Sequence, residues 1–333
     1  MNHKDKVIVF CTVLFIVLMI FTIIQSSKGP TNNIESVTKT IKIDKSKLNI
    51  FCFYVGQADS TLIMNENEVM LIDVGEKSDG EMITQFLKEI GVKRIDYLIG
   101  THSDDDHIGG MSNIIQNFEI GNLYIPDREA TNEAYIDLLN TANDNIKIEN
   151  VNLKDVINLG KAQFVVKWVD NEEKYSDNNS SIVLQLNYGD KKYLFTGDME
   201  KEIEEKLISE NKLEDIDILR VAHHGSNSST SEVFLNEITP EVAIISSGST
   251  YSQFPNVNCL RRILKKIDFK NLYITERDGT IWISSDGNGI DDIKRLENLN
   301  LDGAKSRIKP ESFNEDYLRS ILDDEYAFSI DII

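Results

Sequence analysis

Short apolar runs alternate with amphipathic segments along most of this chain, and this pattern limits its fold more narrowly than any other feature. A first series begins near Leu48 and includes LNIFCFYV, EVMLIDVG and RIDYLIGTH. A second includes KKYLFTGD, DIDILRVAHHG and EVAIISSG. Such runs, bounded by turn residues, are typical of buried strands. Two strand-rich series, each with its own amphipathic segments, predict an α/β fold in which two sheets pack face to face beneath outer helices.

The amphipathic segments predict the helices. Between residues 81 and 90, Met82, Phe86, Leu87 and Ile90 recur at helical spacing. Similar patterns predict further helices near 200–210, 230–238, 259–267 and 315–324. Beyond Ile290 the chain is acidic and shows no strand pattern. We therefore expect a domain at 47–289 and an acidic C-terminal extension at 290–333.

The N-terminal part of the chain predicts a membrane segment. A short tail, residues 1–6, precedes eighteen uncharged residues at 7–24, which is long enough for a helix to span the hydrocarbon of a bilayer. A cleaved secretory signal is the alternative. A retained transmembrane anchor is favoured because the following QSSKG lacks a small-x-small cleavage site. Residues 25–46 are polar and suit a linker.

This segment also predicts where the protein resides. We expect a single-pass protein of the cell membrane with its catalytic domain outside the cytoplasm, or a secreted protein if the segment is cleaved. The N-terminal tail is short, and long domains cross membranes largely regardless of the charges that flank the span.

Net charge limits the partners. The chain has 55 acidic and 35 basic side chains, a formal net charge of −20. Such a surface repels polyanions over a Debye length. Stable binding of duplex nucleic acid through a basic face is therefore not expected.

The stretch THSDDDHIGG, residues 101–110, holds the densest set of potential metal ligands. It follows a buried run and contains His102, Asp104, Asp106 and His107. So many acids at one strand end are costly unless a divalent cation compensates them. An exposed acidic loop that binds nothing is the alternative.

Two other apolar runs also end on potential ligands. Asp198 follows Gly197, which permits a tight turn, and His223 and His224 close the run RVAHH. Four of the five histidines of the chain lie in these motifs, which packing alone does not explain. The sequence therefore predicts that distant strand ends converge on two adjacent divalent metal ions.

In this order, HxDxDH, GD and HHGS resemble the metallo-beta-lactamase fold and, within it, the extracellular domain of the ComEC/Rec2 competence protein family. The resemblance covers residues 48–286. It implies an αββα sandwich whose metals lie at the edge between the sheets. It also implies six ligands: His102 and Asp104 on one metal, Asp106, His107 and His224 on the second, and Asp198 shared. Neighbouring residues at a strand end point apart, so only one of His223 and His224 is expected to bind the second metal, and the likeness favours His224 over His223.

The resemblance further implies a hydrolase that uses metal-bound hydroxide on a phosphodiester, as a ComEC-like nuclease or a phosphocholine-type esterase. Its substrate would be a small phosphoester or a short single-stranded nucleic acid. Three residues receive catalytic roles. Asp198 would hold the metal pair, Asp106 would orient the hydroxide, and His223 would contact the substrate oxyanion.

Three departures from the family pattern affect these expectations. Many relatives have a histidine in place of Asp104, another in the region that here reads SDNNSSIVL (176–184), and a third in place of Phe254. The first metal site is thus richer in oxygen, which shifts its preference from zinc toward manganese or leaves this site weakly filled. The departures also leave open a catalytically inactive, membrane-tethered binding or sensor module.

Three further positions have competing interpretations. Asp73 either bonds to the ligand loop or caps a turn. For Ser226, a turn or cap is favoured over a nucleophile, because no free base remains to activate it. Asp278 followed by Gly279 predicts a hairpin turn, and we assign these two residues no catalytic or ligand role.

Overall fold

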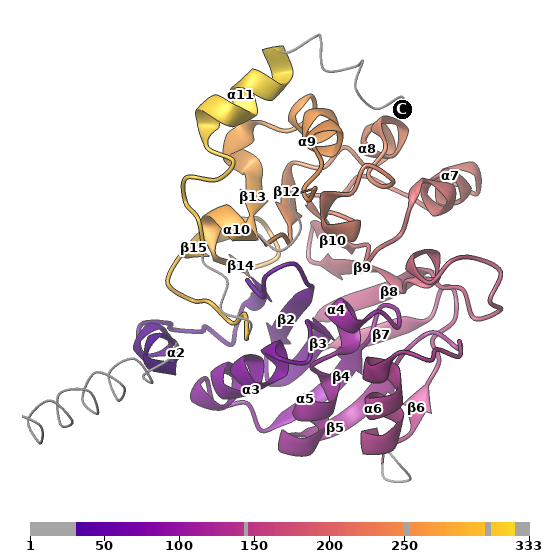
Figure 1. The fold of residues 1–333 in the computed structure, drawn as a ribbon, viewed down its shortest axis with the longest axis vertical. Helices are drawn as coiled ribbons and strands as arrows, with labels where there is room; N and C mark the ends of the chain where they lie inside the picture. The colour runs from indigo at the N-terminus through magenta and orange to yellow at the C-terminus, as the bar shows by residue number, and fades with distance from the viewer. Residues whose placement is uncertain (1–30, 143–145, 249–252, 304–307, 324–333) are drawn as a thin grey trace, which may run out of the picture.

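The computed structural model describes residues 31–142, 146–248, 253–303 and 308–323. Two mixed β-sheets lie face to face, with helices on both outer faces (Figure 1). The predicted α/β sandwich is therefore confirmed.

One sheet has eight strands in the order β15-β14-β1-β2-β3-β4-β5-β6. Their bounds are β1 (Leu48–Cys52), β2 (Ser60–Asn65), β3 (Glu68–Val74), β4 (Arg94–Ile99), β5 (Glu119–Tyr124), β6 (Ile148–Glu149), β14 (Thr280–Ser285) and β15 (Ile290–Leu296). The other sheet has seven strands in the order β13-β12-β11-β10-β9-β8-β7. Their bounds are β7 (Val156–Leu159), β8 (Ala162–Trp168), β9 (Val183–Tyr188), β10 (Lys191–Phe195), β11 (Ile218–Arg220), β12 (Val242–Ile245) and β13 (Leu272–Ile274).

The helices cover the two outer faces. Beside the eight-stranded sheet lie α2 (Thr31–Thr38), α3 (Asp79–Glu89), α4 (Asp105–Ile108), α5 (Met111–Asn117) and α6 (Glu133–Ala142). Beside the seven-stranded sheet lie α7 (Lys201–Ser209), α8 (Glu232–Ile238), α9 (Val257–Leu264) and α11 (Glu315–Asp323). The short α10 (Thr275–Asp278) connects β13 to β14.

Strand β1 shows how the sequence builds this layering. Ile50 and Cys52 belong to the core between the sheets, whereas Phe51 and Phe53 belong to the core beneath the helices. Successive side chains of a strand point to opposite faces. Because both faces are covered, β1 is apolar at nearly every position instead of at every second one.

Parallel pairing places the ligand motifs at one edge of the sandwich. Strand β3 pairs with β4, and β10 pairs with β11, each in parallel. The carboxyl ends of parallel strands meet at the same edge, and the loops that follow them touch. His223 N, after β11, donates to Gly197 O (3.1 Å), after β10. Ile182 N, directly before β9, joins the same edge by donating to Thr101 O (2.8 Å).

The N-terminal expectations are tested only in part. The predicted anchor at 7–24 lies outside the described residues. Among the described residues, no helix is both long and apolar enough to cross a bilayer. The expectation of a free linker through residue 46 is wrong, because Ile34 on α2 is fully buried in the core beneath the helices.

The expectation that strand structure stops at Ile290 is also wrong. Strand β15 pairs antiparallel with β14, and Leu299 and Leu301 are fully buried against the first layer of helices. Helix α11 forms where predicted. Its Leu318 and Ile321 are buried in the core between the seven-stranded sheet and the helices that cover it. Residues 290–303 and 308–323 thus belong to the folded domain.

Two other local expectations differ from the structure. Asp278 and Gly279 do not form a hairpin, because β13 and β14 lie in different sheets and α10 connects them. Residues 119–159 supply β5, α6, β6 and β7, which the apolar pattern did not predict.

A buried carboxylate fixes the returning C-terminal segment. Asp79, 1 % exposed, accepts hydrogen bonds from Gly303 N (2.7 Å) and Glu76 N (2.8 Å). These bonds favour its charged form, but burial, helped by the charge of Asp302, outweighs them and raises the pKa of Asp79 to about 8.

The raised pKa of Asp79 makes the free energy of unfolding depend on pH. Between the unfolded pKa of about 4 and the folded pKa of about 8, the folded chain holds a proton that the unfolded chain releases. The free energy of unfolding should therefore fall as pH rises through this window, by an amount on the order of 2 kcal/mol. Urea unfolding at pH 5 and pH 8 measures the change, and Asp79→Asn should flatten it. An equal slope in this variant would refute the assignment.

Candidate metal centre

Three loops bring the predicted ligands together. The loop after β4 carries His102 and His107, the loop after β10 carries Asp198, and the loop after β11 carries His223 and His224. Gly197 has a φ of +49°, and a Cβ on it would lie 2.9 Å from Ser181 Cβ, so only glycine fits this turn.

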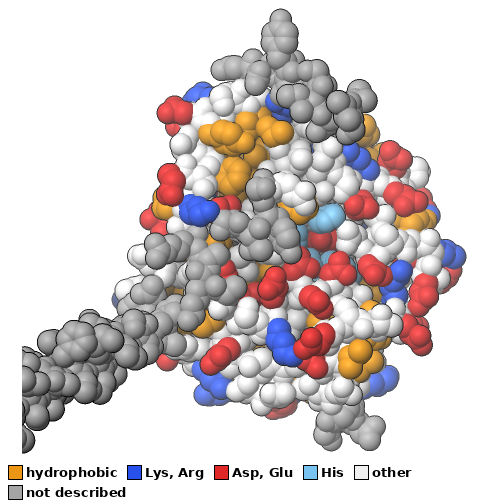
Figure 2. All heavy atoms as spheres, viewed as in Figure 1, with side chains coloured by type: hydrophobic (Ala, Val, Ile, Leu, Met, Phe, Trp, Pro, Cys, Tyr) orange, Lys and Arg blue, Asp and Glu red, His pale blue; other side chains and the backbone are white. Residues whose placement is uncertain are grey.

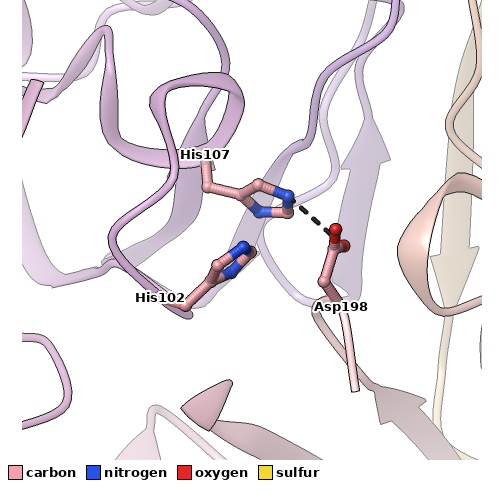
Figure 3. A group of neighbouring side chains, drawn as sticks. All are labelled: His102, His107 and Asp198. Atoms are coloured by element: carbon pink, nitrogen blue, oxygen red, sulfur yellow. Dashed lines mark ion pairs between the residues drawn. The ribbon is translucent and has the colours of Figure 1, made fainter. Parts of the chain in front are cut away.

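The core of the centre is His102, His107 and Asp198, whose side chains point toward one another in Figure 3. Both imidazoles are fully buried and Asp198 is 3 % exposed. His107 Nε2 lies 3.3 Å from Asp198 Oδ1, and the two imidazole rings are 4.1 Å apart. One potential ligand atom from each residue lies within 4.8 Å of the others.

Three of these buried atoms have no hydrogen-bond partner among the described residues: His102 Nε2, His107 Nε2 and Asp198 Oδ1. His224 Nδ1 is a further unpaired atom. Each unsatisfied buried polar atom costs about 1–3 kcal/mol. Because imidazole nitrogen and carboxylate oxygen are the ligands that zinc and manganese accept, these residues fit a divalent cation.

A second group overlaps the first. Asp106, His107 and His224 also offer ligand atoms within 4.8 Å of one another, and His224 Nε2 lies 3.2 Å from Asp106 Oδ2. His107 belongs to both groups but has only Nε2 free, because Asp73 engages its Nδ1. If His107 serves the second group, the first retains His102 and Asp198.

Asp104 lies at the edge of the first group. Its Oδ2 is 3.4 Å from His102 Nε2 and its side chain is 43 % exposed, but it belongs to none of the compact groups. His102 beside it lowers the pKa of the Asp104 carboxyl. The residue is therefore within reach of a metal that His102 would hold.

No side chain from SDNNSSIVL replaces the missing histidine as a strong ligand. Asp177 pairs with Arg128 (2.5 Å), and Asn179 Oδ1 accepts from Glu200 N (2.8 Å). Ser181 instead occupies the position beside the centre, with its Oγ 3.4 Å from His102 Nδ1 and accepting from Asp198 N (3.0 Å). This segment thus positions two ligands and leaves the first site poor in nitrogen.

Asp73 bonds to the loop after β4, which carries His102 and His107. Of its two interpretations, support of this ligand loop is therefore the one that the structure favours over a simple turn cap. It accepts from Thr101 N (2.8 Å) and Thr101 Oγ1 (2.9 Å), and its Oδ2 lies 2.9 Å from His107 Nδ1. A carboxylate here fixes the Nδ1–H tautomer of His107 and turns Nε2 toward Asp198.

Replacing Asp73 with asparagine should weaken metal binding about 10- to 100-fold. The amide can still accept from Thr101 N, but its NH₂ group would face His107 Nδ1 and oppose the required tautomer. Competition against a chromophoric chelator measures the affinity. Asp316→Asn, on the exposed face of α11, is the matched control. Equal affinity in both variants would contradict this role.

The two neighbouring histidines do not point apart, contrary to the expectation from a strand end. Both have left-handed backbone, with φ of 50° at His223 and 52° at His224. Consequently both Nε2 atoms approach Asp198 Oδ2, His223 at 3.7 Å and His224 at 3.9 Å. The side chain of His224 is 3 % exposed and that of His223 is 19 % exposed, so only His223 is open to a substrate.

Electrostatics also favour a bound cation. Burial opposes charge on His107, but Asp198, Asp73 and Asp106 outweigh it and raise the pKa of the imidazole well above its usual value. Burial likewise opposes charge on Asp106 and Asp198. His107 and His224 outweigh it, so the pKa of Asp106 falls to about 2 and that of Asp198 lies well below its usual range. The surrounding carboxylates therefore stabilise a positive charge at His107, and a divalent ion that displaces the proton of this ring would meet the same negative field.

A third group, Asp59, Asp73 and His107, has a different role. Asp59 forms a buried ion pair with Arg220, and Asp59 N donates to Asp106 O (3.0 Å). These contacts join the β1–β2 loop to the ligand loop and to β11. Sequence reasoning missed this pair because its members are 161 positions apart.

Three other residues near the centre, Ser226, Asp105 and Phe254, are not ligands. Ser226 forms a turn, in which its Oγ accepts from Ser228 N (3.2 Å). Asp105 accepts from Asn132 Nδ2 (2.8 Å) and belongs to none of the compact groups. The Phe254 ring lies 5.8 Å from the ring of His223, so an apolar wall stands where the resemblance to the family implies a histidine.

A cleft of about 420 Å³ opens beside the centre, with Asp106 in its wall. Figure 2 shows acidic side chains gathered around the visible histidine surface.

Comparison with known proteins gives consistent matches. The family model described as Metallo-beta-lactamase superfamily matches residues 53–249. The chain is 32 % identical over 209 residues to ComE operon protein 3 of Bacillus subtilis, covering 62 % of this chain and 26 % of that protein. It is 31 % identical over 215 residues to Recombination protein 2 of Haemophilus influenzae, covering 63 % and 25 %. The chain thus spans about a quarter of the length of these relatives, and the resemblance to the ComEC/Rec2 branch is confirmed.

Among solved structures, the chain is similar to CmlA, a diiron beta-hydroxylase from Streptomyces venezuelae. The identity is 13 % and the TM-score 0.47, over 70 % of this chain and 53 % of that chain.

Proposed function

Because the chain belongs to the metallo-beta-lactamase superfamily, we propose that it is a metal-dependent hydrolase that cleaves a phosphodiester. The convergence of His102 Nε2, His107 Nε2 and Asp198 Oδ1 carries this proposal, since these buried atoms have no hydrogen-bond partner among the described residues. We propose two divalent ions, one held by His102 and Asp104, the other by Asp106, His107 and His224, with Asp198 shared. The oxygen-rich first position favours manganese over zinc.

When bound, such ions lower the pKa of water toward neutrality and neutralise charge that develops on a phosphoryl oxygen. The chain supplies orientation. Asp106, fixed by its contact with His224 (3.2 Å), would orient the attacking water. His223 is the exposed histidine of the centre and would contact the substrate oxyanion.

The proposed substrates are small phosphoesters or short single-stranded nucleic acids. The name of one relative, Recombination protein 2 of Haemophilus influenzae, supports a phosphodiester of this kind. The net charge of −20 disfavours a long nucleic-acid track. We further propose that residues 7–24 attach the protein to the cell membrane with the catalytic domain outside the cytoplasm.

A hydrolysis screen tests the proposal. Full-length protein in detergent, loaded with Mn²⁺ or Zn²⁺, is incubated with bis(p-nitrophenyl) phosphate, single-stranded DNA and a chromogenic lactam. We expect turnover of a phosphodiester that stops on chelation and returns with metal. Tight metal binding without turnover of any substrate would instead indicate a binding or sensor module, the alternative that Phe254 favours.

A further inference from the structure

Left-handed backbone is concentrated in the segment that follows β11. Thr230 has a φ of 54°, in addition to the two left-handed histidines at 223 and 224, and Gly225 between them has a φ of 78°. A residue other than glycine in this conformation costs free energy, and it persists only where the surrounding structure over-determines it. Contacts from neighbouring elements are therefore needed to hold residues 223–231 in place.

A buried carboxylate supplies the first of these contacts. Glu204 lies on α7, is 0 % exposed and belongs to none of the ligand groups. It accepts hydrogen bonds from Thr230 N and, at 2.9 Å, from Ser231 N. Ser231 Oγ in turn accepts from Phe234 N (3.2 Å) and caps the start of α8. Because a carboxylate is costly to bury without hydrogen bonds, these two backbone amides explain its position.

An arginine on α9 supplies the second set of contacts. Arg262 Nε donates to Thr230 O (2.9 Å). Its two Nη atoms donate to Asn227 Oδ1 (3.0 Å) and Ser229 O (2.8 Å). A guanidinium carries its donors in a rigid plane, so it fixes these three acceptors relative to one another. Helices α7 and α9 lie on either side of α8 (Figure 1), and the segment is thus held from both.

The held segment is bonded directly to the two histidines. Ser226 N donates to His223 O (2.7 Å), and Ser228 Oγ lies 3.5 Å from His223 Nδ1. Ser229 Oγ donates to Ala222 O (3.0 Å), the carbonyl that precedes the pair. The position of residues 226–231 therefore determines the turn in which the two histidines lie.

We propose that Glu204 and Arg262 are positioning residues of the metal centre, which fix residues 226–231 and thereby turn both adjacent histidines toward Asp198. Neither side chain would touch a metal ion. Without them the histidine pair would relax toward extended backbone, in which neighbouring side chains point apart, and His224 would no longer reach the second ion. The role rests on the proposed metal centre and extends it to two helices that carry no ligand.

Metal affinity in a double-mutant cycle tests the proposal on the full-length protein. Arg262→Met should weaken Zn²⁺ binding about tenfold, the lower value for groups that orient metal ligands, in competition against a chromophoric chelator. The same change made in His224→Ala should have no further effect, because the ligand that Arg262 positions is already absent. Equal weakening in both backgrounds, or none in the wild-type background, would overturn the positioning role. A wild-type protein that binds no Zn²⁺ would instead overturn the metal centre itself.

Arg277→Met is the matched control for lost stability. Arg277 also donates to two backbone carbonyl groups, Leu272 O (2.5 Å) and Phe313 O (3.2 Å), but these lie in β13 and before α11, outside the ligand loops. This variant should keep the wild-type Zn²⁺ affinity, and an equal loss in both arginine variants would contradict a specific role.

Glu204→Gln keeps the test decisive if Arg262→Met does not fold. The amide retains one acceptor, but its NH₂ group would face the second backbone amide. We therefore expect a smaller loss of Zn²⁺ affinity, about threefold, which corresponds to one hydrogen bond. Here too the loss should vanish in the His224→Ala background. Unchanged affinity in Glu204→Gln would exclude this carboxylate from the positioning role.

Discussion

Asp198→Ala is expected to lower kcat/KM for bis(p-nitrophenyl) phosphate by about 10³-fold or more. Its carboxylate lies between His107 (3.3 Å) and the two adjacent histidines (3.7 and 3.9 Å), so no other acidic side chain in the centre is as central. A metal ion contributes several kcal/mol of charge stabilisation in the transition state, and each 1.36 kcal/mol corresponds to about tenfold in rate.

The fold should survive this change. Asp198 N still donates to Ser181 Oγ, and removing a buried carboxylate also removes its desolvation cost. Steady-state kinetics and circular dichroism on the same preparation measure the two effects. Asp316→Ala, exposed on α11, is the control. An Asp198→Ala protein with more than a tenth of wild-type turnover would exclude a bridging role.

Arg220→Met should cost about 3–5 kcal/mol in the free energy of unfolding, because it leaves Asp59 buried and unpaired. Arg220 is 5 % exposed, pairs with Asp59 and Ser246, and donates to Ile244 O (3.2 Å). It therefore joins β11, whose following loop carries the two adjacent histidines, to the β1–β2 loop, in which Asp59 N donates to Asp106 O (3.0 Å).

Urea unfolding of the apo protein measures this cost without interference from metal. Arg319→Met is the comparison, since its side chain is 58 % exposed and pairs with Glu315 on the same helix; about 0.5 kcal/mol is expected. Adding Asp59→Asn to Arg220→Met should recover part of the loss. A cost below about 1 kcal/mol for Arg220→Met would mean that the buried pair is not structurally important.

The strand ends could be predicted because their chemistry is local. Each ligand motif directly follows an apolar run, and the carboxyl ends of parallel strands share an edge. The sequence therefore predicted the convergence of His102, His107 and Asp198 that the structure contains. The layering could be predicted for the same reason, since strands covered on both faces are apolar throughout.

The remaining features depend on context that a linear pattern does not contain. Strand β15 has the sequence IDDIKRL and lies at the edge of its sheet. Edge strands often carry charged side chains, so this strand lacks the apolar pattern from which strands were predicted. The turn of His223 and His224 toward one carboxylate results from left-handed backbone, which is uncommon outside glycine and carries no sequence signature here. The contacts of Asp59 with Arg220 and of Ser181 with His102 join distant segments.

Elemental analysis of the purified full-length protein, after equilibration with Mn²⁺ or Zn²⁺ and removal of free metal, tests the central claim most directly. We predict about two divalent ions per chain in the wild type and a loss of at least one in His107→Ala, because His107 belongs to both ligand groups. A wild-type protein that retains less than a tenth of an equivalent of either metal would contradict a metal centre at these residues.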